Sequence, residues 1–499
     1  MLITLGFSMI AVFMYLILTK RLTPMVALIL VPLTFAALAG AFGITGQADE
    51  GVVDSIMTAI GDFAPTAVLL FFAIIYFGLM IDVGLFDKLV AGILKLVGND
   101  PAKVVIGTAI LTALISLDGD GSTTFIVVTA ALLPVYQRLG LSPVVLTCVA
   151  GLTNGTLNIV PWGGPTARAA AALGVDASDV FLPMLPSLAV GIALCLAFAW
   201  SLGVSERRRL RREDPFRWGP GGDVAAVDGL TGGSISGGRG KGSGPRGGSP
   251  VSPAPEGSIG DRARQVAVLE ELRTDVEEAP SLADSALDPN RSTLRPKLFW
   301  FNLALTVGIM VTLVLDVVPL PYLFMVGSAI ALVVNFPKIG DQAKMVTAHA
   351  SEIIAVVSMV MAAAVLTGVL SGTGMVDAMS AWLVSVIPTS MGPFMAVITG
   401  LISIPATFFM SNDAFYFGIL PVLAETGAHY GIPAVEMARA SITGQPVHMQ
   451  SPLVPAILLL VSLSRVDLGD HHKKVLWRAL VVALAMLAVG VLVGSIGLG

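Results

Sequence analysis

Two short polar segments, residues 117–124 and 410–413, interrupt long apolar runs at corresponding places in the two halves of the chain. Adding 290 to a residue number in the first half gives its counterpart in the second half, without a gap, from residue 78 to residue 153. The identical pairs include Gly78 and Gly368, Gly84 and Gly374, Asp87 and Asp377, Phe125 and Phe415, Pro143 and Pro433, Ala150 and Ala440, and Thr153 and Thr443. A duplicated membrane unit with a polar interruption in each copy is typical of secondary transporters.

The composition indicates a polytopic membrane protein. Of its 499 residues, 55% are hydrophobic and only 13% are charged, with a mean hydropathy of +0.85. A soluble protein of this length needs more charge at its surface. Cys148 and Cys195 lie in separate apolar segments, which argues against a disulfide framework or a thiolate metal site. No basic patch with interleaved aromatic residues indicates nucleic-acid binding.

Apolar runs of membrane-spanning length divide each half in the same way. We predict spans at about 2–19, 23–43, 62–83, 141–173 and 180–203 in the first half, and at about 298–316, 319–337, 353–373, 434–463 and 473–497 in the second half. Segments 102–137 and 391–427 each hold two shorter apolar runs around a polar tip, which indicates re-entrant hairpins. The expected fold is an all-α polytopic membrane protein with about ten transmembrane helices, two re-entrant hairpins and two discontinuous helices.

Charge placement sets the expected orientation. With the N-terminus outside, basic residues gather in cytoplasmic loops and acidic residues in outer loops, with Arg439 as the main exception. Five crossings in each half then make residues 1–203 and 297–499 an inverted repeat. Residues 204–296 begin with a basic cluster at 207–212, which is suited to anionic membrane lipid, and continue as a Gly-, Ser- and Pro-rich cytoplasmic linker that we expect to be largely disordered.

The aspartates of the first polar segment are candidates for cation or proton chemistry. Asp118 and Asp120 lie among apolar residues, where an ionised carboxylate carries a cost of at least ~2.5–3.5 kcal/mol. An apolar environment and a neighbouring carboxylate both favour the protonated form, so the pair could hold a proton or bind a divalent cation. Asp413 in the second segment offers a third carboxylate. The alternative makes these aspartates turn residues, since Asp-Gly-Asp-Gly is also favourable turn chemistry.

Each predicted hairpin is followed by a span that contains proline and glycine in its middle, at 153–166 and 443–452. Both residue types break helices, and the freed backbone groups can bind ions and oxyanions. Arg168, just beyond the first break, is a candidate for pairing with a substrate carboxylate, or alternatively with Asp176 or the membrane surface. His448, within the second break, is either a proton relay or a structural histidine.

These motifs resemble those of the citrate–divalent metal:proton symporter family (CitMHS) of bacteria. The resemblance rests on residues 117–124, Asn154-Gly155, 158–166, 411–413, 444–448 and 451–455, and it covers nearly the whole chain outside 204–296. Ser411-Asn412 is also similar to the Ser-Asn-Thr tips of the wider ion transporter superfamily. In this chain Asp413 replaces the threonine, which favours proton or metal handling over sodium coupling.

The resemblance implies import of citrate complexed to a divalent cation, Mg²⁺ or Ca²⁺, together with protons. It also implies a homodimer in the bacterial inner membrane that works by an elevator mechanism, with the cation as co-substrate and no permanently bound cofactor. Metal or proton coupling would then fall to Asp118, Asp120, Asp413 and His448. Substrate binding would fall to Ser122, Thr123, Asn154, Asn158, Thr166, Ser411, Asn412, Thr443, Gln445 and Ser451.

Other functions remain open from the sequence. A proton- or sodium-coupled carrier of free dicarboxylates, tricarboxylates or another organic acid has the same general features. An intramembrane aspartate enzyme is disfavoured, because the carboxylates lie at hairpin tips within a two-fold repeat rather than on two facing regular helices. We therefore predict that the chain is a transporter and not an enzyme. An ion channel would differ from either carrier by a far higher conductance.

Overall fold

The computed structural model describes residues 1–41, 51–213 and 291–498, and these residues form helices and connecting turns without a β-strand. The prediction of an all-α polytopic membrane protein is confirmed. Most of the linker predicted at 204–296 lies outside the described residues.

The described residues of the first half, 1–41 and 51–213, form ten α-helices. They are α1 (Leu2–Leu18), α2 (Pro24–Ala41), α3 (Val52–Asp82), α4 (Leu85–Val97), α5 (Pro101–Ile115), α6 (Gly121–Leu139), α7 (Pro143–Leu157), α8 (Gly164–Leu173), α9 (Ala177–Phe181) and α10 (Leu185–Glu213). A short 3-10 turn, η1 (Ser116–Asp118), joins α5 to the loop before α6.

The described part of the second half has a similar order of elements, although some of them are divided into shorter pieces. Its helices are α14 (Phe299–Leu315), α15 (Leu320–Asn335), α16 (Ile339–Ala348), α17 (Ala350–Gly372), α18 (Met375–Val386), α19 (Met395–Phe409), the π-helical η6 (Ala414–Ile419), α20 (Leu420–Ala428), α21 (Ala434–Ser441), η7 (Ile442–Gly444), α22 (Gln445–His448), α23 (Pro455–Leu463) and α24 (Leu468–Leu492). The offset of 290 therefore places α4 on α18, and α7 on the segment from α21 to α22.

The two halves also share a backbone feature, a glycine with a left-handed φ before each of the corresponding helices α4 and α18. Gly84 before α4 has a φ of 83°, and Gly374 before α18 has a φ of 68°. Both values are left-handed, a region that favours glycine because it lacks a Cβ atom. Each glycine ends a long helix, α3 or α17, and turns the chain into a shorter one.

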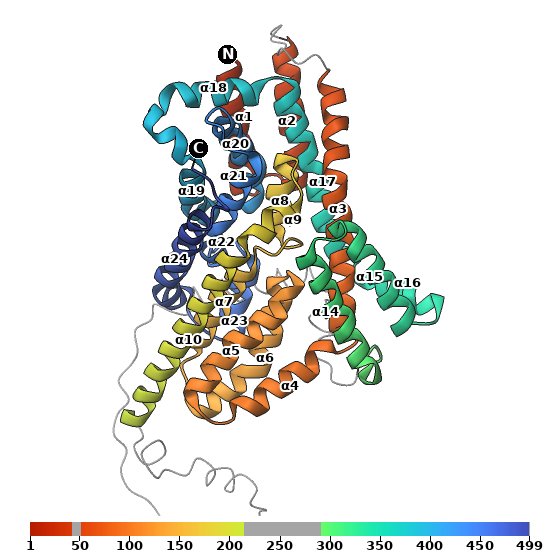
Figure 1. Cartoon of the computed structure of the whole chain (residues 1–499), viewed down its shortest axis with the longest axis vertical. Helices are drawn as coiled ribbons and strands as arrows, with labels where there is room; N and C mark the ends of the chain where they lie inside the picture. Colours follow the sequence, from red (N-terminus) through yellow and green to blue (C-terminus); the bar gives the residue numbers. More distant parts are fainter. Residues whose placement is uncertain (42–50, 214–290, 499) are drawn as a thin grey trace, which may run out of the picture.

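The helices form two bundles that α4 and α18 connect at opposite ends (Figure 1). One bundle contains α2, α3, α14, α15 and α17, in which α3 and α17 lie side by side and run in opposite directions (Figure 1). The other contains α5 to α10 and α19 to α24, in which α10 packs on α5 and α24. The α5–α6 hairpin enters the second bundle from the end marked by α4, and the α19–α20 hairpin enters from the end marked by α18 (Figure 1).

Eight helices among the described residues are long and apolar enough to cross a membrane, compared with the ten spans expected. They are Pro24–Ala41, Val52–Asp82, Pro101–Asp118, Ala177–Glu213, Pro296–Leu315, Ala350–Gly372, Thr389–Phe409 and Leu468–Leu492. Two of them, Pro101–Asp118 and Thr389–Phe409, fall in the segments predicted as hairpins. The count differs because the broken helices are divided into short pieces, while Leu2–Leu18 and Leu320–Asn335 are shorter than a full span.

The observed helix interruptions are narrower than the sequence predicts. The first break is residues 158–163, between α7 and α8, and the second is residues 449–454, between α22 and α23. Residues 153–157 and 443–448 remain helical, because amides and glycine weaken a helix without ending it. Pro165 is the second residue of α8, and Pro455 is the first residue of α23. In the first turn of a helix the backbone N–H has no partner within the helix, so proline is tolerated there.

Helix α10 extends to Glu213, ten residues beyond the predicted end of its span at 203. Polar contacts with the base of the first hairpin explain this extension. Arg207 pairs with Asp100 at 2.5 Å, and the Glu206 carboxylate accepts from the Ser142 amide at 2.9 Å. The first part of the expected linker is therefore a helix that packs against the α5–α6 hairpin.

Candidate functional site

The first tip, residues 116–120, turns the chain between α5 and α6. Gly119 has a left-handed φ of 80°, and Asp120 is the N-cap of α6. The Asp120 carboxylate accepts from the amides of Ser122 at 3.2 Å and Thr123 at 2.8 Å. Asp120 thus has the cap role that turn chemistry predicts, and the N-terminal end of α6 stabilises its negative charge.

Asp118 is placed differently in the same turn. Its Oδ1 accepts from the Asp120 amide at 2.9 Å, while its Oδ2 is buried and has no hydrogen-bond partner among the described residues. A buried polar atom without a partner is costly, and a ligand or a proton at that position would remove the cost. Asp118 is therefore the first-tip carboxylate with spare capacity for a cation or a proton.

Helix α7 and the first break hold this tip in place. The Asn154 side chain on α7 donates to the Ser116 hydroxyl at 2.9 Å, and its own Oδ1 is buried without a partner. The Trp162 indole donates to the Leu117 carbonyl at 2.8 Å. The indole also packs on Phe77 of α3 and Phe324 of α15, with centroid distances of 5.2 Å and 5.0 Å. The first tip therefore lies where the two bundles meet.

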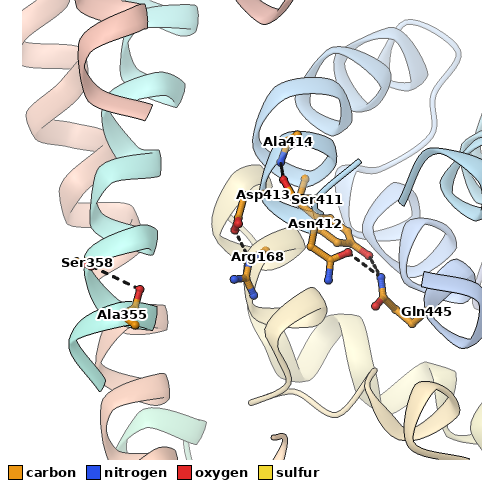
Figure 2. Close-up of polar contacts among 9 residues, drawn as sticks. Arg168, Ala355, Ser358, Ser411, Asn412, Asp413, Ala414 and Gln445 are labelled. Atoms are coloured by element: carbon orange, nitrogen blue, oxygen red, sulfur yellow. Dashed lines mark hydrogen bonds and ion pairs between the residues drawn. The ribbon is translucent and has the colours of Figure 1, made fainter. Parts of the chain in front are cut away.

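The second tip, residues 410–413, carries an ion pair. Arg168 on α8 donates from Nε to Asp413 Oδ1 at 2.6 Å, and their side chains are only 16% and 10% exposed (Figure 2). A carboxylate that is removed from water requires such a partner. Asp413 therefore pairs with Arg168, rather than joining Asp118 and Asp120 in one acidic cluster, and neither Asp176 nor the membrane surface takes up the guanidinium.

A chain of side-chain amides links the first break to the second tip. Asn158 donates to Gln445 Oε1 at 3.0 Å, and Gln445 Nε2 donates to Asn412 Oδ1 at 3.3 Å and to the Tyr416 hydroxyl at 2.9 Å. Figure 2 shows Gln445 facing Asn412, beside the Arg168–Asp413 pair. Three of the predicted substrate-binding residues, Asn158, Asn412 and Gln445, are thus joined although they come from three separate segments. Amides that can reorient and a nearby guanidinium suit a polyanionic oxygen ligand.

Several other predicted residues bond to nearby backbone groups. The Thr166 hydroxyl donates to Ile159 at 2.7 Å and that of Thr443 to Ala440 at 2.8 Å, whereas the Ser451 hydroxyl donates to Phe408 at 2.6 Å. The Ser411 hydroxyl accepts from the Ala414 amide at 3.2 Å (Figure 2). His448 is bonded through Nδ1 to the Thr407 carbonyl at 2.6 Å, as a structural histidine would be, and it interacts electrostatically with Arg168 and Asp413. These hydrogen bonds between side chains and the backbone stabilise the conformation of the two breaks and of the second tip.

Ionisable residues of the other bundle also face this region, and the sequence analysis missed them. His349 Nε2 lies 3.1 Å from Asp82 Oδ2, and both side chains are buried. Glu352 interacts electrostatically with this pair and with Asp120. The available signal was the acidic residue itself, because a charge at the end of an apolar run such as 62–82 marks a functional candidate. Ser116, Tyr416 and Gln450 were also missed, and nothing in their local sequence indicates their long-range partners.

Within the described ranges, no group of three or more His, Cys, Asp or Glu side chains is arranged to hold a metal ion. The first tip therefore supplies at most part of a coordination shell. A hard divalent cation that arrives with its own carboxylate ligands needs only a few further oxygens from the protein. Asp118 and Asp120 have the correct donor chemistry for that role.

Residues 13–444 match the family model described as CitMHS, Citrate transporter. A protein of Bacillus subtilis named "Citrate transporter" is 44% identical over 99% of this chain and 100% of its own length. A second B. subtilis protein, named "Mg(2+)/citrate complex secondary transporter", is 42% identical over 100% of both chains.

The fold is similar to that of the YdaH transporter of Alcanivorax borkumensis, with a TM-score of 0.50 and 15% identity over 94% of this chain and 97% of the other. That crystal structure was described as having an unusual topology. At this level of identity the match shows a similarity of fold. The family match and the two full-length relatives establish that the chain belongs to the citrate transporter family.

Proposed function

We propose that the chain carries citrate as a complex with a divalent cation, Mg²⁺ or Ca²⁺, across the membrane together with protons. The observation that carries the proposal is the difference in charge between the two tips. Asp118 and Asp120 are bonded to backbone amides, whereas Asp413 is balanced by Arg168. The first tip is thus suited to a cation, and the region around the second tip is suited to carboxylates.

Charge balance explains why the two ligands would travel together. Citrate is a trianion at neutral pH, and a divalent cation leaves its complex with a single negative charge. The carboxylates of Asp118 and Asp120 attract the cation, while the side-chain amides of Asn158 and Asn412, which Gln445 holds in place, offer N–H donors to the free carboxylate oxygens. A proton on the first tip would compensate the remaining charge when the complex enters or leaves.

The arrangement of the bundles supports an elevator movement. Both tips and both breaks belong to one bundle, and α4 and α18 connect it to the other bundle at opposite ends (Figure 1). The two bundles also meet along α8, which contacts α3 and α17. A displacement of the second bundle, which contains both tips and both breaks, along α3 and α17 would carry the whole site without dismantling it.

Uptake of labelled citrate into proteoliposomes tests this proposal. We expect uptake to require Mg²⁺ or Ca²⁺, to stop when a chelator is added, and to increase when the outside is made more acidic than the inside. Replacement of sodium by choline should have no effect. Uptake that persists in the presence of chelator and requires sodium would show that the proposal is wrong.

A carrier of free carboxylates is the second candidate, and the position of Arg168 favours it. If Arg168 released Asp413, its guanidinium would face the amides of Asn412 and Gln445 and could pair with a substrate carboxylate (Figure 2). Uptake of succinate or citrate without any divalent cation distinguishes this candidate from the first.

A further inference from the structure

Gln450 is the second residue of the second break, 449–454, and is fully buried. Its Nε2 donates to two backbone carbonyls, Gly151 of α7 at 3.0 Å and Pro446 of α22 at 2.9 Å. Its Oε1 lies 3.1 Å from Nε2 of His471, and its backbone carbonyl lies 2.7 Å from Nε2 of His472. These four hydrogen bonds of Gln450 reach α7, α22 and α24, and its backbone amide donates a fifth to the Val447 carbonyl at 3.0 Å.

The chemistry of the partners fixes the direction of each bond. Both hydrogens of the Gln450 amide are used by carbonyl oxygens, which can only accept. Gln450 Oε1 and the Gln450 carbonyl must then accept from the two histidines, so His471 and His472 both carry a hydrogen on Nε2. If the Gln450 amide were flipped by 180°, its Oε1 would face the two carbonyl oxygens of Gly151 and Pro446. Only the observed orientation of the amide is therefore stable.

Gly151 leaves the space that this arrangement requires. A Cβ atom at residue 151 would lie 2.7 Å from Gln450 Oε1 and 3.3 Å from Cε1 of His471. No side chain larger than hydrogen fits there unless the amide or the ring moves. The contact between α7 and the second break thus depends on glycine at this position.

The bonded carbonyls lie next to the residues of the proposed site. Gly151 is three residues before Asn154 on α7, and Pro446 follows Gln445. By holding these two carbonyls on one amide, Gln450 sets the distance between α7 and α22. That distance decides whether Asn158 reaches Gln445, the 3.0 Å contact that joins the first break to the second tip.

We propose that Gln450, held by His471 and His472, is a positioning residue that keeps the carboxylate-binding amides of the two repeats in register. None of the three has to touch the substrate for this role. The inference rests on the proposed function for its effect on citrate, and its effect on the backbone is independent of the substrate.

Hydrogen exchange of the purified full-length protein tests the positioning role without any substrate. We expect Gln450→Met, which keeps the length of the side chain but removes the amide, to accelerate exchange about tenfold in residues 446–457 and 147–158, since buried bonds worth ~1–3 kcal/mol are lost. Gln137→Met, at an exposed position on α6, is the matched control and should leave both segments unchanged. Unchanged exchange in Gln450→Met would overturn the proposal.

Transport kinetics separate positioning from general damage. We expect Gln450→Met to raise the KM for citrate with Mg²⁺ about tenfold while the maximal rate falls less than about threefold. Gly151→Ala should have the same effect, and the double variant should be little worse than either single one because both act on one contact. Independent, multiplicative effects of the two variants would contradict the proposal.

Variants of His472 test whether a hydrogen-bond donor at this position is needed to hold Gln450. The glutamine in His472→Gln places a donor near the position of Nε2 and should retain the wild-type KM, whereas His472→Leu should behave like Gln450→Met. Equal KM values for His472→Gln and His472→Leu would overturn the role of His472. If Gln450→Met changes hydrogen exchange but the wild type takes up no citrate, the proposed function fails and the positioning role stands.

Discussion

At the first tip, backbone amides bond to the carboxylates of Asp118 and Asp120, whereas at the second tip the carboxylate of Asp413 pairs with the guanidinium of Arg168. The two tips occupy corresponding places under the offset of 290, and a hairpin carries each of them. The same backbone unit thus presents spare negative charge at one tip and a balanced ion pair at the other. From this difference we propose that the first tip binds the cation and that the region around the second tip binds the carboxylates.

The largest expected effect concerns the ion pair of the second tip. Arg168→Met leaves the buried Asp413 carboxylate without its partner, which should lower the free energy of unfolding by about 3–5 kcal/mol. The double variant Arg168→Met with Asp413→Leu should recover most of that stability, since no buried charge remains. Thermal unfolding in detergent measures both. Equal stability of the single and double variants would mean that the pair is not a structural unit.

At the first tip, loss of the charge on Asp118 should change metal dependence. We expect Asp118→Asn to raise the Mg²⁺ concentration for half-maximal citrate uptake by roughly 10–100-fold, the usual effect of losing an oxygen near a metal. The variant should fold normally, because the uncharged amide suits a buried position better than an ionised carboxylate does. An unchanged Mg²⁺ requirement would exclude Asp118 from cation binding.

For the chain of side-chain amides around Gln445, we expect a change in the KM for citrate and no change in metal dependence. Gln445→Leu removes the bonds to Asn158, Asn412 and Tyr416, so the KM for citrate should rise about tenfold while the Mg²⁺ requirement stays unchanged. Tyr416→Phe, which removes only one of these bonds, is the control and should have a smaller effect. A changed Mg²⁺ requirement in Gln445→Leu would contradict the proposal that the cation and the carboxylates bind at different tips.

The smallest effect is expected at the contact between the first tip and the other bundle. Trp162→Phe loses the bond from the indole to Leu117 but keeps a ring against Phe77 and Phe324. One hydrogen bond is worth ~1 kcal/mol, so citrate uptake should fall only about fivefold. Trp162→Leu, which also loses the aromatic contacts, should fall further. Equal rates for the two variants would show that ring packing does not contribute.

The sequence predicts the tips and the breaks well, because polar residues, proline and glycine are conspicuous in an apolar chain. The offset likewise pairs Gly84 with Gly374, and in the structure these glycines precede the corresponding helices α4 and α18. The pattern places the breaks too widely, since Asn154 and Thr443 remain in helices. Local patterns cannot decide whether an amide continues a helix when its partner lies on another segment.

Side-chain partners are the part that the sequence could not predict. Arg168 and Asp413 are 245 residues apart, and Asp82 and His349 are 267 residues apart, so only the packed helices bring them together.

Arg439, the exception to the expected charge pattern, also has partners that are distant in the sequence. Its guanidinium donates to the Asp179 carbonyl from Nε at 3.0 Å and from Nη2 at 2.9 Å. It also donates from Nη1 to the Ser495 carbonyl at 3.1 Å. These hydrogen bonds explain why a basic residue lies at this position.

The position of a bound cation tests the assignment of the two tips most directly. Anomalous diffraction from crystals grown with Mn²⁺ and citrate would locate the metal without ambiguity. We predict one peak about 2.0–2.3 Å from a carboxylate oxygen of Asp118 or Asp120, with citrate extending towards Asn158 and Gln445. A peak coordinated by Asp413, with Arg168 displaced from it, would contradict the assignment.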